Sequence, residues 1–89
     1  MSKVYIAFQE NDESRYIVEA IEEINDDCTV IHMPAMIRVE REHKLVIQRE
    51  VVEEKMGRAW DIQELHLNLI TLGGNVEEED DYFTLEWKQ

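Results

Sequence analysis

The sequence predicts a small α+β domain, spanning residues 1–89, in which two β-α-β-β halves pack around a shared core. Short segments with alternating apolar residues predict half-buried strands, and one longer segment with helical spacing predicts an amphipathic helix. The chain's 89 residues leave room for one domain, and 44% of them are apolar, so a modest core can form. The two halves share no sequence identity that would indicate duplication.

The first half is predicted to contain a strand, a helix and two more strands. Residues 3–8 alternate between two faces with the period of a half-buried strand. Three possible N-cap residues begin the helix: Asn11, Asp12 and Ser14. Its apolar residues then recur at i, i+3, i+4 and i+7: Ile17, Ala20, Ile21 and Ile24. Residues 28–33 and 36–40 are predicted strands, separated by a break at Pro34.

The second half repeats this order. A strand over 44–48 precedes a helix over 50–56, which Gly57 is well placed to end in the left-handed conformation, and residues 61–64 can add another helical turn. Residues 65–72 are predicted to form a strand that bulges or becomes buried on both faces, because apolar residues occupy both of its faces.

A hairpin connection and a last strand complete the chain. Gly73, Gly74 and Asn75, together with the acidic run 77–81, are predicted to form the connection. The apolar face of the last strand is predicted to consist of Phe83, Leu85 and Trp87.

The charge balance disfavours several kinds of partner. The formal net charge is −12, and acidic residues are spread over both halves, so phosphate backbones and anionic lipids are repelled. The longest run without a formal charge, residues 65–76, is far shorter than the roughly 20 residues of a transmembrane helix. Cys28 is the only cysteine, and the first residues lack the features of a signal peptide. We therefore expect a cytoplasmic protein that binds neither nucleic acid nor membrane.

No motif predicts catalysis or cofactor binding by this chain. The three histidines lack metal-ligand spacing, and the five carboxylates of residues 77–81 lack the pattern of a calcium loop. Gly73 and Gly74 precede carboxylates rather than a phosphate-loop motif. We expect no catalytic, metal or cofactor site. Trp60 and Trp87 are expected in the core rather than as interface anchors.

Three stretches together resemble a known family. They are His32-Met33-Pro34-Ala35-Met36-Ile37-Arg38-Val39-Glu40, Gly57-Arg58-Ala59-Trp60-Asp61-Ile62-Gln63-Glu64-Leu65, and Gly73-Gly74-Asn75-Val76 with the acidic run that follows. This pattern resembles the effector proteins of methane, phenol and toluene monooxygenases. The phenol hydroxylase branch fits best, over nearly the whole chain, and the longer N-terminal tail of the methane enzyme's effector is absent.

The resemblance implies a regulatory protein without a cofactor of its own. Such a protein docks on a di-iron hydroxylase oligomer of three subunit types and promotes coupled hydroxylation of phenols, while a reductase with FAD and a 2Fe-2S cluster supplies electrons from NADH. The enzyme would be a bacterial phenol 2-monooxygenase. Candidate contacts are polar residues expected on strands or loops and two methionines beside the proline corner: Asn11, Met33, Met36, Arg38, Gln48, His66, Asn68 and Asn75.

Two other functions compete with this interpretation. An acidic mimic of nucleic acid would space carboxylates like phosphates along one surface, whereas here they cluster in the first helix and the acidic run. A small enzyme would need a converging set of catalytic groups, which the sequence does not indicate.

Overall fold

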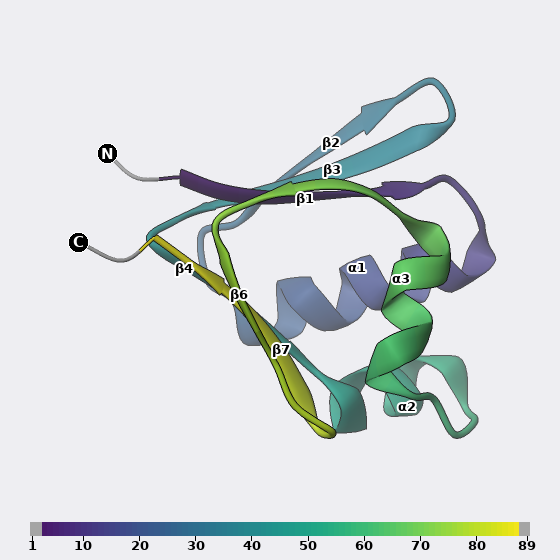
Figure 1. The fold of residues 1–89 in the computed structure, drawn as a ribbon. Helices are drawn as coiled ribbons and strands as arrows, with labels where there is room; N and C mark the ends of the chain where they lie inside the picture. Colours follow the sequence, from purple (N-terminus) through teal and green to yellow (C-terminus); the bar gives the residue numbers. More distant parts are fainter. Residues whose placement is uncertain (1–2, 88–89) are drawn as a thin grey trace.

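The computed structural model describes residues 3–87, in which two antiparallel sheets and two main helices enclose one core (Figure 1). The strand order is β2-β3-β1-β5 in the four-stranded sheet and β4-β7-β6 in the three-stranded sheet. The small α+β fold predicted from the sequence is confirmed. β5 belongs to the second half of the chain but pairs with β1, so the first sheet joins both halves.

β1 (Lys3–Gln9) is the central strand of the fold, and α1 (Asp12–Ile24) follows it at once. Asn11 is the N-cap, and its side chain accepts a 2.8 Å hydrogen bond from the Ser14 backbone N–H. The predicted apolar stripe is buried at Ile17, Ala20 and Ile21. No helix in residues 3–87 is both long and apolar enough to cross a membrane.

β2 (Thr29–Met33) and β3 (Met36–Glu42) form a hairpin whose loop is Pro34 and Ala35. Ala35 has a φ of +64°, a left-handed conformation that L-residues adopt at some cost. The ring of Pro34 fixes the φ of Pro34 itself, at a value that suits the first central position of a tight turn. The strand begins one residue after Cys28, which packs partly buried against the core.

β4 (Lys44–Gln48) leads into α2 (Arg49–Met56). Gly57 ends α2 with a φ of +72°, as its position in the sequence predicts. A 3₁₀ turn, η1 (Ile62–Glu64), follows after a short loop and continues into α3 (Leu65–Asn68).

The prediction of a strand over residues 65–72 is wrong for its first four residues, which form α3. A capping box explains the helix: the Asp61 backbone N–H donates to the Glu64 carboxylate, while the Asp61 side chain accepts from the Glu64 backbone. This signal lies immediately before the apolar residues and outweighs their alternation.

β5 (Leu69–Gly73) contains the predicted bulge. Phe8 pairs with Leu69 while Ala7 pairs with Thr71, so Ile70 is the extra residue. The predicted hairpin connection over 73–81 is also wrong. Gly73 ends β5, and Gly74, with a φ of +135°, turns the chain from one sheet to the other.

β6 (Asn75–Glu78) and β7 (Tyr82–Glu86) form the second hairpin. Its acidic run therefore begins in a strand, and only residues 79–81 form the turn. The fully buried side chains of both sheets and both main helices meet in one cluster, which includes Phe8, Ile21, Val52 and Phe83.

The two tryptophans differ in environment. Trp60 is buried in the core, as predicted. Trp87 is 43% exposed, so the prediction that it is a core residue is wrong. Its indole N–H donates a 2.7 Å hydrogen bond to the Lys3 carbonyl, which joins the residue after β7 to the start of β1.

Candidate partner-binding surface

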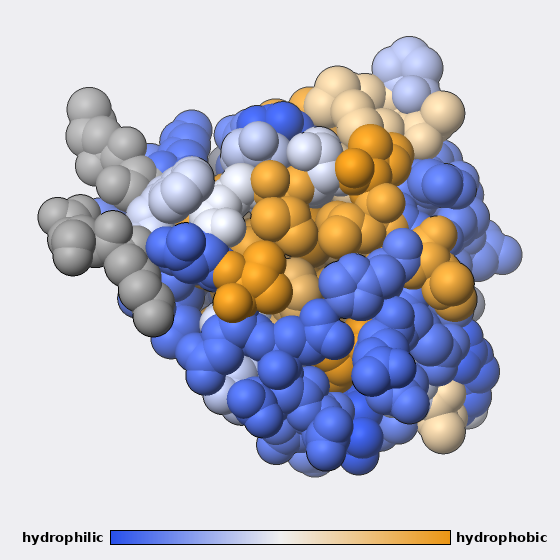
Figure 2. Space-filling model, viewed as in Figure 1, coloured by the Kyte–Doolittle hydropathy of each residue, from blue (hydrophilic) through white to orange (hydrophobic). Residues whose placement is uncertain are grey.

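Three exposed hydrophobic side chains lie on α3, β5 and β6. Leu67 is 72% exposed, and Ile70 and Val76 are each 47% exposed. We call these three residues the β5 patch. Figure 2 shows hydrophobic residues gathered on this face of the molecule, with hydrophilic residues around them. Contiguous exposed apolar surface rimmed by polar groups is typical of a protein interaction site.

Local backbone structure explains why these side chains face outward. The single turn of α3 buries Leu65 and Asn68, which leaves Leu67 between them on the outer side. Ile70 is the bulged residue of β5, and bulges redirect side chains. Val76 lies on β6, an edge strand whose described residues are all exposed.

The outer face of the four-stranded sheet adds a second exposed area. α1 lies beneath this sheet, and Figure 1 shows the other side uncovered within residues 3–87. Met33 and Met36 pair across the hairpin at one end of this face and are both partly exposed. Methionine side chains adapt readily to partner surfaces.

Arg38 lies on the same face and is held in place by two neighbours. Its guanidinium carbon is 4.0 Å from the centroid of the Tyr5 ring. Its Nε donates a 2.8 Å hydrogen bond to the Glu40 carboxylate. The cation is therefore positioned on the sheet before any partner binds.

His66 and Asn75 flank the β5 patch. The His66 Nε2 atom lies 2.8 Å from a Glu78 carboxylate oxygen, and its ring meets Phe83 edge-on with centroids 6.3 Å apart. Asn75 is exposed at the start of β6. The acidic side chains of 77–81 continue from there, so the apolar patch has a polar, negatively charged border.

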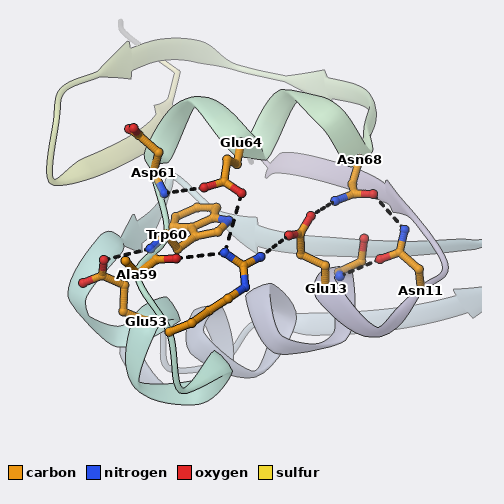
Figure 3. A network of polar contacts seen from close by, with 10 residues as sticks. Asn11, Glu13, Glu53, Ala59, Trp60, Asp61, Glu64 and Asn68 are labelled. Atoms are coloured by element: carbon orange, nitrogen blue, oxygen red, sulfur yellow. Dashed lines mark hydrogen bonds and ion pairs between the residues drawn. The ribbon is translucent and has the colours of Figure 1, made fainter.

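A chain of polar contacts fixes α3 to α1 (Figure 3). Asn11 Nδ2 donates to Asn68 Oδ1 at 2.7 Å, and Asn68 Nδ2 donates to Glu13 at 2.6 Å. The other oxygen of Glu13 accepts from Arg58 at 2.6 Å. Asn68 is buried, so this chain supports Leu67 from behind.

The loop before α3 is held in the same network. The Trp60 backbone N–H donates to Glu53 of α2 at 2.9 Å, and Arg58 donates to the Ala59 carbonyl at 2.8 Å (Figure 3). Arg58 also lies 3.7 Å from Glu64. The short helix that presents Leu67 is thus joined to both main helices.

The structure brings some of the sequence-predicted residues together. Met33, Met36 and Arg38 share the outer sheet face, and His66 and Asn75 flank the β5 patch. Asn11 and Asn68 bond to each other beneath α3. Gln48 is exposed at the end of β4, at the opposite edge of the three-stranded sheet from β6.

Sequence reasoning missed the β5 patch itself. The alternating pattern predicts that Leu67 lies on the face of a strand, whereas the D-x-x-E signal at Asp61 and Glu64 indicates a helix. If that helix continues through residue 68, Leu65 and Leu67 lie on different sides of it, whereas a strand places them on the same face. The exposure of Ile70 and Val76 depends on the bulge and on the change of sheet at Gly74, which no local pattern locates.

Reactive groups are not concentrated on this surface. Burial raises the pKa of the Cys28 thiol, and the nearby Glu22 carboxylate adds to this shift, so the thiol remains protonated. Within residues 3–87, no cluster of three His, Cys, Asp or Glu side chains could hold a metal ion.

Comparisons with known proteins identify the family of this chain. Residues 2–86 match the MmoB/DmpM family. The stimulatory component DmpM of phenol 2-monooxygenase from Pseudomonas sp. (strain CF600) is 61% identical over 87 residues, which cover 98% of this chain and 97% of that protein. The family resemblance drawn from the sequence is thereby confirmed.

Solved structures extend the comparison. A chain in a phenol hydroxylase–regulatory protein complex superposes with a TM-score of 0.93 at 54% identity, covering 98% of this chain and 100% of that chain. The soluble methane monooxygenase regulatory protein B has a TM-score of 0.76 at 15% identity, covering 97% of this chain and 65% of that chain. At this low identity the second likeness concerns the fold alone.

Proposed function

This chain belongs to the MmoB/DmpM family, and from that membership we propose that it is the regulatory component of a multicomponent phenol monooxygenase. It binds the hydroxylase component and stimulates coupled hydroxylation of phenols, while catalysis takes place in the hydroxylase. The observation that carries this proposal is the near full-length likeness to a stimulatory component and to a regulatory chain in a hydroxylase complex.

The resemblance noted in the sequence supports a more detailed assignment. The partner is a di-iron hydroxylase oligomer of three subunit types, and a reductase with FAD and a 2Fe-2S cluster delivers electrons from NADH. This chain acts as one domain over residues 1–89 in the bacterial cytoplasm, with no cofactor of its own. Its net charge of −12 disfavours nucleic acid and anionic membranes as additional partners.

A protein without catalytic groups can stimulate an enzyme by shifting its conformational equilibrium. The regulatory protein favours the active hydroxylase only if it binds that conformation more tightly than the resting one. A difference of about 1.4 kcal/mol in binding free energy changes the ratio of the two conformations tenfold. Pre-positioned contacts, such as the fixed Arg38 side chain, reduce the ordering cost of binding.

We place the docking surface on the β5 patch and the outer face of the four-stranded sheet. The apolar residues supply buried contact area, and the acidic border supplies electrostatic complementarity to a basic surface. Of the polar candidates, we propose direct contact for His66 and Asn75, which are exposed, and for Arg38, which is partly exposed. Asn11 and Asn68 would act by fixing α3, and Gln48 would require an interface that extends to β4.

Reconstitution tests the proposal. The purified chain is titrated into a phenol hydroxylase and its reductase, with NADH and phenol, and both product and NADH oxidation are measured. We expect a saturable rise in product per NADH as the chain approaches equimolar amounts with the hydroxylase. Absence of both binding and stimulation would reject the proposal and return attention to an acidic nucleic-acid mimic.

A further inference from the structure

β2 is an edge strand without the usual protection against pairing. It has a neighbour only on the β3 side, and residues 29–33 contain no charged residue and no proline. Natural edge strands commonly carry charges, prolines or bulges that prevent further pairing. Within residues 3–87, the other edge strands do carry such features: Lys44 in β4, the bulge in β5, and Glu77 and Glu78 in β6.

The register shows which residues of β2 face the free edge. Met33 and Met36 close a two-residue hairpin loop, and such a closing pair exchanges backbone hydrogen bonds. Hydrogen-bonded and non-hydrogen-bonded pairs alternate along an antiparallel ladder. Val30 and His32 are therefore in non-hydrogen-bonded pairs with β3, and their N–H and C=O groups point to the free edge.

A groove runs alongside this edge. Val30 and His32 pair with the buried Val39 and Ile37, so their side chains lie on the same side of the sheet as α1. Together with α1 they border a hollow of about 240 Å³, whose apolar part is lined by Val18, Val30 and Ile37. Small-molecule sites measure roughly 300–1,000 Å³, so the groove suits one inserted side chain better than a metabolite.

Carboxylates of α1 give the groove a negative charge. Glu19 and Glu22 both line it, and neither forms an ion pair within residues 3–87. Arg15 also borders the groove, but its guanidinium is already paired with Glu10 and Asp12. A Lys or Arg side chain with an apolar stem would match both the lining and the charge.

We propose that an extended segment of a partner protein adds to the free edge of β2 and inserts a Lys or Arg side chain between Glu19 and Glu22. Main-chain hydrogen bonds to Val30 and His32 supply affinity, and the groove supplies specificity for a basic residue. A second copy of this chain is a poor occupant, because its β2 contains no Lys or Arg and each copy carries a net charge of −12.

The groove and the proposed hydroxylase surface use different faces of the four-stranded sheet. The groove lies on the α1 side, next to Val30 and His32, whereas the hydroxylase surface comprises the β5 patch and the outer face, to which Met33 of β2 belongs. Failure of strand addition would not affect the docking proposal, and failure of docking would not affect this one.

A peptide titration followed by ¹⁵N-HSQC NMR tests the inference. The probe is the blocked peptide Ac-Thr-Val-Lys-Val-Lys-Val-Thr-NH₂, and its control has Glu in place of both Lys residues. We expect saturable shifts of the Val30, His32, Glu19 and Glu22 amides with the Lys peptide, and at least tenfold weaker binding of the Glu peptide. Equal binding of both peptides, or shifts confined to other strands, would overturn the proposal.

Two variants at position 32 distinguish the contribution of the backbone N–H to peptide binding from that of the side chain. His32→Pro removes the outward N–H while leaving the β2–β3 hydrogen bonds intact, and should weaken the Lys peptide at least tenfold. His32→Ala keeps the N–H and should bind as the native chain does. A folded His32→Pro protein with native affinity would refute strand addition. If that variant does not fold, the Glu19→Gln/Glu22→Gln protein replaces it, and undiminished Lys-peptide binding then counts against the proposal.

Discussion

Asn11 and Asn68, 57 positions apart in the sequence, are joined by a 2.7 Å hydrogen bond from Asn11 Nδ2 to Asn68 Oδ1. The same Asn11 side chain caps α1 by accepting from the Ser14 backbone. One residue therefore fixes both the start of α1 and the end of α3. Because α3 presents Leu67, the exposed β5 patch depends on a partly buried amide contact.

Asn68→Ala should lower the free energy of unfolding by about 1–3 kcal/mol, because it leaves polar groups of Asn11 and Glu13 without their partner. Chemical denaturation followed by circular dichroism measures this change. Asn75→Ala is the matched control: Asn75 is exposed, and its removal should change stability by no more than about 0.5 kcal/mol. Equal effects of the two substitutions would show that the amide network contributes no stability.

Gly73→Ala should also destabilise the protein, because an added Cβ would lie 2.2 Å from the Cε1 atom of Tyr5. The Tyr5 ring, which packs against the Arg38 guanidinium, would have to shift, at a cost of about 1–3 kcal/mol. A double-mutant cycle with Tyr5→Ala measures the contribution of this clash to the unfolding free energy. If the effects of Gly73→Ala and Tyr5→Ala on the unfolding free energy are additive, the destabilisation by Gly73→Ala does not come from the clash with Tyr5.

Tyr82 should make stability depend on alkaline pH. Its hydroxyl donates a 2.8 Å hydrogen bond to Glu77, which raises the pKa of Tyr82 in the native state. Because the native pKa exceeds that of the unfolded chain, about 10, this stabilisation is present below pH 10 and is lost as pH rises through the native pKa.

Denaturation of the native chain and Tyr82→Phe at a series of pH values checks this. The stability difference between them should be constant below about pH 10 and shrink above it. The pKa values of Lys55 and Arg15 are also raised. The native chain and Tyr82→Phe both contain these two groups, so their effects cancel in the stability difference. A difference that does not vary with pH would contradict the assignment.

Local signals in the sequence predicted most of the fold. The alternation in β1, the apolar stripe of α1 and the left-handed Gly57 each depend on neighbours within one turn or strand, and each is confirmed. The helix over residues 65–68 has a local signal, the capping box at Asp61 and Glu64, which the alternation of apolar residues obscures. The other errors concern features that tertiary structure decides. Pairing of β5 with β1 and the change of sheet at Gly74 require contacts between distant segments, which periodicity does not encode.

The candidate surface was less predictable than the fold. Sequence reasoning selected polar residues and the methionine corner, because these are common interface residues when exposure is unknown. Whether a leucine is buried or exposed depends on its secondary structure, and the alternating pattern predicts a strand at Leu67, where the structure has a helix. Asn11 and Asn68 are both candidate contact residues predicted from the sequence. The structure shows that they bond to each other, and this supporting role depends on how α3 packs against the start of α1.

Association with the hydroxylase should slow as salt concentration rises. The net charge of −12 can steer this chain toward a basic surface, and the Debye length falls from about 10 Å at 0.1 M to about 3 Å at 1 M ionic strength. Stopped-flow measurement of the association rate constant over this range tests the effect. A rate constant that does not change with salt would argue against steering.

Leu67→Ala should weaken hydroxylase binding without unfolding the protein. The side chain is 72% exposed, so its loss should change stability by no more than about 0.5 kcal/mol. If it is buried at the centre of the interface, truncation should cost at least about 1–2 kcal/mol of binding free energy, or roughly 5- to 30-fold in Kd measured by calorimetry.

Two control variants, one at a leucine and one at a tyrosine, show whether the effect of Leu67→Ala is specific to the β5 patch. Leu65→Ala truncates the buried neighbour on α3 and should instead cost about 2–5 kcal/mol of stability. Tyr16→Ala truncates a side chain that is 39% exposed on α1, outside the β5 patch, and should leave the Kd unchanged. If Leu67→Ala and Tyr16→Ala bind the hydroxylase equally well, the docking surface does not include the β5 patch, because the most exposed side chain of that patch would then make no contribution.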